Sequence, residues 1–211
     1  MDIYALGGLG ADKRTFTYID LKKHNLICLD WLDPGPEDTL VSYAARIADQ
    51  IDHSKKFGLI GVSFGGMIMS EVSKIIEPNH LILISSIATH NELRWVFRKA
   101  GAINLDRIIP FKSMVGSGKL VHYLFGVKLE RDKKLLKEIM EDMSPEFISW
   151  AVKVILRWKN PIGQKCIRIH GTKDRVLPVN KNLLDYPIEG TGHFAIVNDA
   201  EYISEVLDTL C

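Results

Sequence analysis

Cysteine is scarce in this sequence, and long apolar runs are absent. Only three of the 211 residues are cysteine (Cys28, Cys166 and Cys211), and no two of them form a C-x-x-C pair. An odd number of widely spaced cysteines argues against a disulfide framework and provides no zinc motif. No apolar stretch approaches the roughly 18 residues that a membrane span needs. The first residues have neither the basic region nor the apolar core of a signal peptide, so we expect a cytoplasmic protein without a membrane span.

The charge is balanced, with 27 lysines and arginines against 26 aspartates and glutamates and a net charge of +1. Such a chain has no overall field that would attract nucleic acid. Phosphate-binding motifs are also missing, since Gly8-Leu9-Gly10 lacks the third glycine of a dinucleotide loop and no Walker loop occurs. We therefore expect no nucleic-acid partner, no metal and no organic cofactor.

Short apolar runs recur along the chain, and each is closed by small or polar residues. Runs of this length predict strands that are buried on both faces of a sheet. They are Ile3–Leu6, Leu26–Leu29, Phe57–Ile60, Leu81–Ile84 and Cys166–Ile169, with a weaker one at Leu184–Ile188 in which Pro187 suits an edge strand. Helical stripes lie between them, at Thr39–Asp52, Gly66–Ile76 and Ala200–Leu210. The alternation predicts a three-layer α/β/α fold around a mostly parallel sheet of about six strands.

Residues 88–160 do not show this alternation of strands and helices. They contain no good strand candidate, but Lys133–Met143 and Pro145–Trp158 have the pattern of amphipathic helices, the second with Ser144 as a plausible N-cap. We expect a helical cap over 88–160, inserted into a core formed by 1–87 and 161–211. The cap holds 14 lysines and arginines against 8 aspartates and glutamates, a net charge of +6. This excess is either a solvated helical surface or a means of attracting anionic substrates or a membrane surface.

Ser63 occupies a glycine-rich turn, G-V-S-F-G-G over residues 61–66, between the predicted strand Phe57–Ile60 and the following helix. A serine in a strand-to-helix turn is held in a strained backbone conformation, and its flanking glycines are needed because a Cβ there would strike a neighbouring element. The turn lifts the hydroxyl above the sheet edge and places the Phe64 N–H at the positive end of a helix. Ser63 is therefore a candidate nucleophile.

A candidate acid and a candidate base follow Ser63 in the chain. Asp174 lies in the loop after the fifth predicted strand, at the edge of the sheet where sites form, although a simple turn aspartate is the alternative. Glu92, shortly after the fourth strand, is a rival acid. His193 lies in a G-T-G-H-F loop before the last helix. The other histidines lack such a context, and His170, which closes a strand, is expected to be structural; they are His24, His53, His80, His90, His122 and His170.

The serine turn, the G-T-K-D-R-V segment at 171–176 and the G-T-G-H segment at 190–193 together resemble the α/β-hydrolase superfamily. The resemblance covers residues 3–86 and 165–211. It implies Ser63 as nucleophile, His193 as general base and Asp174 as the acid that orients the imidazole. A serine at this position excludes the aspartate nucleophile of dehalogenase-like relatives.

The same resemblance implies an oxyanion hole. The loop after the first core strand, residues 7–11, would supply the Leu9 N–H as a second donor beside the Phe64 N–H. Two features depart from the usual pattern: the two extra strands at the start of most members are missing, and Gly7 replaces the usual histidine before the oxyanion glycine.

The implied activity is hydrolysis of a small carboxylic ester or thioester through an acyl-enzyme. An acyltransferase using the same three residues, or a ligand-binding module with weak or no turnover, are the alternatives. We expect part of the aromatic set in the cap to wall an apolar pocket for short or medium acyl chains, the alternative being that the set only fills the cap's own core. Its members are Trp95, Phe97, Phe111, Tyr123, Phe125, Phe147, Trp150 and Trp158.

Overall fold

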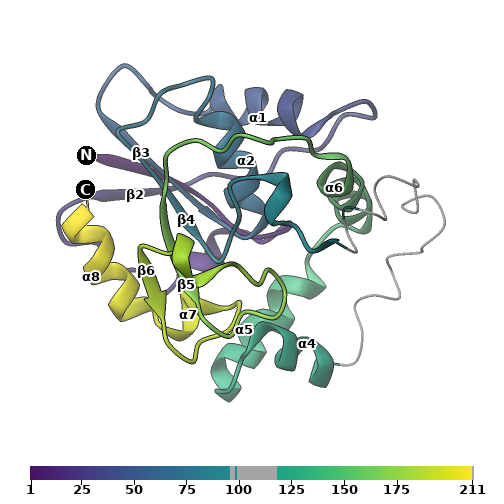
Figure 1. Ribbon diagram of the computed structural model, residues 1–211, viewed down its shortest axis with the longest axis vertical. Helices are drawn as coiled ribbons and strands as arrows, with labels where there is room; N and C mark the ends of the chain where they lie inside the picture. Colours follow the sequence, from purple (N-terminus) through teal and green to yellow (C-terminus); the bar gives the residue numbers. More distant parts are fainter. Residues whose placement is uncertain (96–97, 99–117, 211) are drawn as a thin grey trace.

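The computed structural model describes residues 1–95, 98 and 118–210, and these form a six-stranded parallel sheet. The strands are β1 (Asp2–Leu6), β2 (Asn25–Cys28), β3 (Phe57–Val62), β4 (His80–Ile84), β5 (Ile167–Gly171) and β6 (Tyr186–Ile188). Their order across the sheet is β2-β1-β3-β4-β5-β6, and every pairing is parallel (Figure 1). The expected sheet is therefore confirmed. The weakest predicted strand is the edge strand β6, where Pro187 lies opposite His170.

Helices cover both faces of this sheet, with α1 and α2 on one face and α8 on the other (Figure 1). The helices are α1 (Leu40–Ala48), α2 (Phe64–Val72), α4 (Gly118–Phe125), α5 (Glu130–Glu141), α6 (Pro145–Arg157), α7 (Ala195–Asn198) and α8 (Ala200–Leu210). Helix α2 begins at Phe64 rather than at Gly66, because the two glycines form part of its first turn. The sequence did not predict α4 or α7, and four residues are too few for α7 to show a helical period.

Alternate side chains of the strands enter two separate hydrophobic clusters. Tyr4 and Leu6 of β1 pack on the side of α1 and α2, whereas Ile3 and Ala5 pack on the side of α8. Every residue of β3 is buried. Burial on both faces is why these strands appear as continuous apolar runs rather than as alternating patterns.

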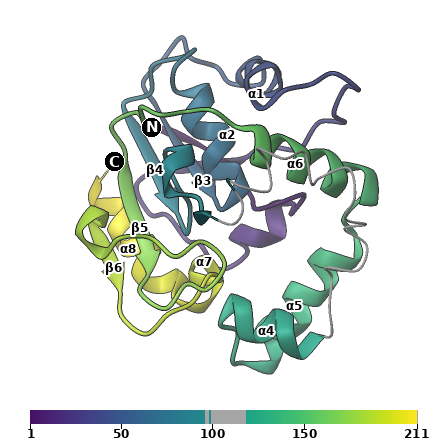
Figure 2. The same cartoon turned by 45° about the vertical axis from the view of Figure 1, so that its right-hand side comes forward.

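The described helices of the expected cap belong to different clusters. Helices α4 and α5 lie side by side, away from α6, in both ribbon views (Figures 1 and 2). Val121 of α4 and Leu136 of α5 join the cluster on the α8 side, whereas Phe147 of α6 joins the cluster formed by α1 and α2. Ser144 caps α6 as expected, since its side chain accepts a hydrogen bond from the Phe147 N–H. A single inserted cap over 88–160 remains a prediction.

An aromatic cluster fixes α6 to the core. The Trp31 and Phe64 rings are stacked, with centroids 5.4 Å apart and planes 6° apart. Phe147 meets the Trp31 ring edge-on at 5.0 Å, and Trp150 lies 4.5 Å from the Tyr43 ring. Aromatic pairs at these separations stabilise the folded state beyond what the burial of their apolar surface contributes. Helix α6 thus shares one buried cluster with α1 and α2.

Two indole N–H groups, of Trp150 on α6 and Trp158 directly after it, donate hydrogen bonds to the core. Trp150 Nε1 donates to the Asp38 carbonyl oxygen at 3.0 Å, and Trp158 Nε1 donates to Glu71 Oε1 at 2.8 Å. Glu71 is buried on α2 and also pairs with Lys74 at 2.8 Å. These polar bonds fix the register of α6 against α1 and α2, because a shift along the helix would leave buried groups without partners.

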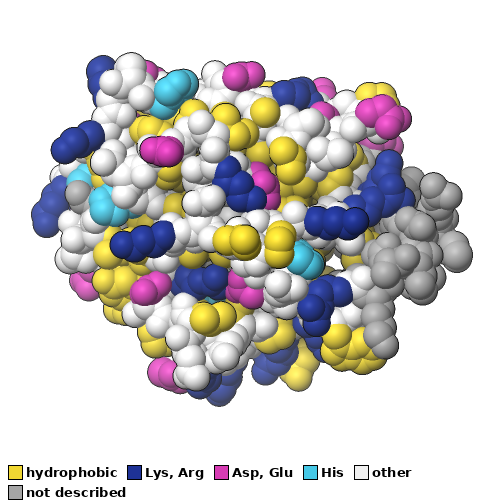
Figure 3. Space-filling view, turned by 45° about the horizontal axis from the view of Figure 1, so that its top comes forward, with side chains coloured by type: hydrophobic (Ala, Val, Ile, Leu, Met, Phe, Trp, Pro, Cys, Tyr) yellow, Lys and Arg dark blue, Asp and Glu magenta, His cyan; other side chains and the backbone are white. Residues whose placement is uncertain are grey.

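Charges are interspersed on the surface, as Figure 3 shows for one face of the molecule. Three lysines of α5 pair with glutamates of the same helix three or four residues away: Lys133–Glu130, Lys134–Glu138 and Lys137–Glu141. Such exposed pairs contribute little to stability. Within the described ranges, no helix combines the length and the apolar character required to cross a bilayer.

Replacing Trp150 by alanine tests the aromatic cluster. Trp150→Ala should lower the free energy of unfolding by about 3–5 kcal/mol, the usual cost of deleting a buried large aromatic side chain. Tyr202→Ala is the control, because the Tyr202 side chain is 41% exposed on α8, and its cost should stay below about 0.5 kcal/mol. Urea unfolding of both variants measures the difference, and equal losses would contradict the packing described for α6.

Candidate active site

The turn that carries Ser63 is strained and held on several sides. Ser63 has φ 52° and ψ −119°, a conformation that non-glycine residues rarely adopt. Its N–H donates to the Ile84 carbonyl oxygen at 3.0 Å. Its own carbonyl oxygen accepts the Gly66 N–H at 3.0 Å and the Ser86 hydroxyl at 2.6 Å. These three hydrogen bonds hold the backbone of Ser63 in its strained conformation.

Three glycines let this turn approach its neighbours. A Cβ on Gly61 would lie 2.4 Å from the Gly66 Cα, and one on Gly65 would lie 2.2 Å from the Gly7 carbonyl oxygen. A Cβ on Gly66 would lie 2.2 Å from the Ser86 hydroxyl oxygen. The expectation that a Cβ would strike neighbouring elements is confirmed. Sequence reasoning missed Ser86; its signal was a serine pair directly after β4, the strand next to β3.

A continuous chain of hydrogen bonds links the three residues that the sequence selected. His193 Nε2 lies 2.9 Å from Ser63 Oγ, and His193 Nδ1 lies 2.7 Å from Asp174 Oδ2. Ser63 follows β3, Asp174 follows β5, and His193 lies between β6 and α7. The parallel sheet brings them together because the carboxyl ends of its strands share one edge.

Asp174 is a buried carboxylate with many donors. Its Oδ1 accepts the N–H groups of Val176 and Leu177, both at 2.8 Å. Burial by itself raises the pKa of Asp174, but the contacts with His193 and His170 outweigh burial and hold this pKa well below its ordinary value. Asp174 therefore remains ionised at neutral pH and can accept a hydrogen bond from the Nδ1–H of His193.

The structure places the rival acid elsewhere. The Glu92 carboxylate pairs with the Arg168 guanidinium and accepts both the N–H and the hydroxyl of Thr89 at 2.9 Å. Burial raises the pKa of Glu92, but the bonds from Arg168 and Thr89 bring it below its ordinary value. Glu92 has no hydrogen bond to His193 among the described residues.

The loop after β1 passes beside Ser63. A Cβ on Gly8 would lie 3.7 Å from the Ser63 Cβ, so the two residues are neighbours. Gly7 has no room for a side chain, because a Cβ would lie 2.4 Å from the Ala11 carbonyl oxygen. Among the described residues, the N–H groups of Leu9 and Phe64 have no hydrogen-bond acceptor, and their role as oxyanion donors remains a prediction.

The aromatic set of the cap divides. The Phe125 ring meets the His193 ring edge-on at 5.2 Å and 87°. Three others are buried and belong to the cluster that α6 shares with the core: Phe147, Trp150 and Trp158. Two are exposed, Trp95 and Tyr123, and two lie outside the described residues, Phe97 and Phe111. A role for part of this set as the wall of an acyl pocket remains a prediction.

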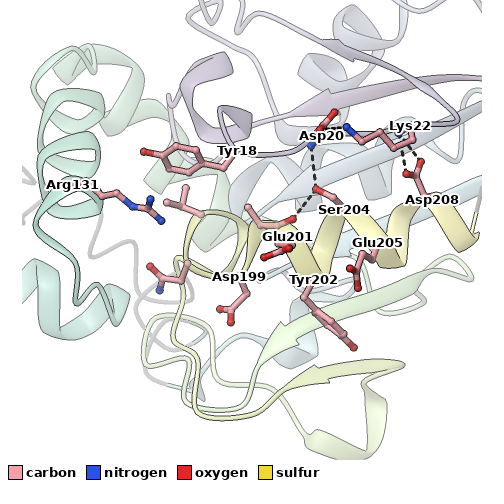
Figure 4. Close-up of a pocket in the computed structure, with 13 residues that line it drawn as sticks. Tyr18, Asp20, Lys22, Arg131, Asp199, Glu201, Tyr202, Ser204, Glu205 and Asp208 are labelled. Atoms are coloured by element: carbon pink, nitrogen blue, oxygen red, sulfur yellow. Dashed lines mark hydrogen bonds and ion pairs between the residues drawn. The ribbon is translucent and has the colours of Figure 1, made fainter.

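A separate groove of about 680 Å³ lies beside α8 (Figure 4). Two of the polar side chains that line it, both on α8, hold the chain segment before β2 against this helix. Ser204 Oγ accepts the Asp20 N–H, and Asp208 accepts the Lys22 N–H. Arg131 reaches from α5 across the Tyr18 ring, at 5.2 Å from its centroid. This groove holds none of the Ser63, His193 and Asp174 side chains. In the part of the chain that the structure covers, no three His, Cys, Asp or Glu side chains gather as metal ligands would.

No protein-family model and no curated protein sequence matches this chain. Solved structures do match it over nearly its whole length. An esterase from Thermogutta terrifontis with malate bound has a TM-score of 0.72 at 13% identity, covering 99% of this chain and 88% of the esterase. A hydrolase from Oleispira antarctica has a TM-score of 0.72 at 15% identity, covering 98% and 89%. The RedJ thioesterase from Streptomyces coelicolor has a TM-score of 0.68 at 14% identity, covering 99% and 89%. This chain has the α/β-hydrolase fold, as the resemblance implied.

Adding a methyl group at Gly66 tests the close approach behind Ser63. Gly66→Ala should destabilise the protein by about 3 kcal/mol, because the new Cβ overlaps the Ser86 side chain. Gly58→Ala is the matched control in the adjoining strand, where a Cβ meets its nearest neighbours at ordinary contact distances of 3.7–3.8 Å. Its cost should stay within about 1 kcal/mol. Thermal unfolding compares the two, and a larger loss for Gly58→Ala would contradict the contact at Gly66.

Proposed function

We propose that this protein is a serine hydrolase that cleaves a small carboxylic ester or thioester through an acyl-enzyme. The observation that carries the proposal is the chain of hydrogen bonds from Ser63 Oγ through His193 to Asp174, built on an α/β-hydrolase fold. The structural neighbours include enzymes described as esterases, hydrolases and a thioesterase, which supports hydrolytic chemistry in general.

Attack on the substrate begins at Ser63. His193 Nε2, 2.9 Å from the hydroxyl, takes its proton as the oxygen attacks the carbonyl carbon. Asp174 accepts a hydrogen bond from the Nδ1–H of His193, which fixes the tautomer in which Nε2 is free to act as the base. The negative oxygen of the tetrahedral intermediate accepts the N–H groups of Leu9 and Phe64, the latter at the positive end of α2.

Collapse of this intermediate releases the first product. His193 donates the proton it took to the leaving oxygen or sulfur, and the acyl group remains on Ser63. A water molecule then gives a proton to His193 and attacks the ester carbonyl, and the second intermediate releases the acid and restores the serine. These steps require no metal or organic cofactor, because the histidine moves the protons and the backbone N–H groups stabilise the charge.

Acyl transfer would use the same residues with an alcohol or amine in place of water, and a ligand-binding module would use the site with little or no turnover. Product analysis in the presence of added alcohol separates the first alternative from hydrolysis. The cytoplasmic location expected from the sequence remains a prediction.

Removal of the nucleophile should abolish the activity. Ser63→Ala should lower kcat for p-nitrophenyl esters of short acyl chains by about 10⁵- to 10⁶-fold, as in other serine hydrolases, with the fold intact. A fluorophosphonate probe should label the wild type and not this variant. Ser54→Ala, which alters an exposed serine, is the control and should react as the wild type does. Activity of Ser63→Ala within tenfold of the wild type, or an unlabelled wild type, would refute the proposal.

Exchange of the acid tests the choice between the two carboxylates. Asp174→Asn should lower kcat by about 10⁴-fold, because an amide donor at this position favours the wrong histidine tautomer. Glu92→Gln, which weakens the pair with Arg168, should reduce stability but leave kcat within about tenfold when measured on folded protein. The assignment would be reversed by a severe loss of kcat in Glu92→Gln and a mild one in Asp174→Asn.

A further inference from the structure

A second imidazole contacts the carboxylate of Asp174. His170 lies near the end of β5 and is 1% exposed. Its Nε2 lies 3.0 Å from Asp174 Oδ2, the same oxygen that faces His193 Nδ1 at 2.7 Å. Its Nε2 also lies 3.0 Å from the Leu177 carbonyl oxygen. We expected His170 to be structural, and the structure shows that its imidazole contacts the oxygen that faces His193.

The partners of His170 define where its proton lies. The two atoms that face Nε2 are both oxygens that can only accept, since Asp174 is ionised and the Leu177 group is a carbonyl. Nε2 therefore carries the hydrogen. It donates this hydrogen to the Leu177 carbonyl oxygen, and Asp174 Oδ2 lies at the same distance of 3.0 Å from Nε2. A neutral imidazole in this tautomer satisfies both contacts, so His170 need not be charged to act as a donor.

The donors around Asp174 divide between its two oxygens. Backbone N–H groups of Val176 and Leu177 hold Oδ1, and the two imidazoles hold Oδ2. In the proposed reaction His193 gains and loses a proton at Nε2 in every cycle, whereas His170 exchanges none. His170 is thus the imidazole beside Oδ2 whose own protonation stays constant through the cycle.

We infer that His170 is a positioning residue that holds Asp174 Oδ2 in line with His193 Nδ1 and shares the charge of this oxygen. This inference rests on the proposed function. A donor to the carboxylate makes it a weaker acceptor for a second donor, so His170 moderates how strongly Asp174 stabilises protonated His193. No covalent bond changes at His170.

The charged neighbours leave this contact undisturbed. Among the described residues, the ionisable side chains in polar contact with the Asp174 carboxylate are His193, at 2.7 Å, and His170, at 3.0 Å. The adjacent Arg175 donates to the Tyr123 carbonyl oxygen at 3.0 Å and lies over the Tyr123 ring, 4.2 Å from its centroid. A change at His170 therefore acts on the base through Asp174.

Two replacements of similar size separate the hydrogen bond from packing. The amide nitrogen of His170→Gln can occupy the place of Nε2 and donate, whereas His170→Met fills a similar volume without a donor. His170→Met should lower kcat about tenfold with KM within about twofold. The acid limb of its kcat/KM profile should move up by about half a pH unit, because Oδ2 then favours protonated His193 more strongly. His170→Gln should restore both to near the wild type.

A measurement without substrate accompanies the kinetics. The proton NMR signal of His193 Nδ1–H should move to lower field in His170→Met and return in His170→Gln, because loss of one donor strengthens the remaining bond to Oδ2. Unfolding temperatures identify any variant that fails to fold, and His170→Leu then serves as the donor-free variant.

An unmoved acid limb and an unmoved Nδ1 signal in folded donor-free protein would overturn the inference, and so would equal effects in His170→Gln and His170→Met. If the wild type neither reacts with fluorophosphonate nor cleaves esters, the proposed function fails, and the Nδ1 signal alone decides the role of His170.

Discussion

The close approach of α2 to the sheet is the constraint on which the site depends. The backbone at Gly61, Gly65 and Gly66 lies so near to its neighbours that a methyl group at any of these positions would overlap them. This approach lets the chain turn from β3 into α2 within one residue, and Ser63 takes up the strain with a positive φ. The same turn fixes the positions of the Ser63 hydroxyl and of the Phe64 N–H, because Ser63 directly precedes α2 and Phe64 is its first residue.

A buried charge organises the other half of the site. Asp174 is ionised inside the protein, so the surrounding chain must supply donors. The loop after β5 provides two N–H groups, and it is held against the His193 loop by a bond from the Lys173 N–H to the Thr191 carbonyl oxygen at 2.9 Å. Gly171 allows this contact, because a Cβ there would lie 2.4 Å from the same oxygen. Burial alone would favour the protonated acid, and the groups in contact with Asp174 keep it ionised instead.

Helix α4 and the turn after it also contact the His193 loop. The Phe194 N–H donates to the Phe125 carbonyl oxygen at 3.0 Å, and a Cβ on Gly192 would lie 2.8 Å from the Gly126 Cα. Together with the aromatic cluster around α6, these contacts make the described helices between β4 and β5 parts of the packed structure. Segments far apart in the chain therefore set the position of His193.

The sequence by itself predicted the six strands of a mostly parallel sheet and the glycine-rich turn at Ser63, because these depend on local patterns: short apolar runs, alternation of strands with helices, and residues without a Cβ. The order of the strands across the sheet came from the structure. It also identified Asp174 and His193 as candidates, but left Glu92 open, since no local pattern shows which carboxylate reaches the histidine. Only the tertiary structure decided that Glu92 pairs with Arg168 and that His170 shares an oxygen of Asp174 with His193. Glu92 and Arg168 are 76 positions apart, and the contact of His170 with Asp174, four positions further on, depends on how the loop after β5 turns back. Such contacts depend on how strands and loops meet in space, and that arrangement leaves no periodic mark in the chain.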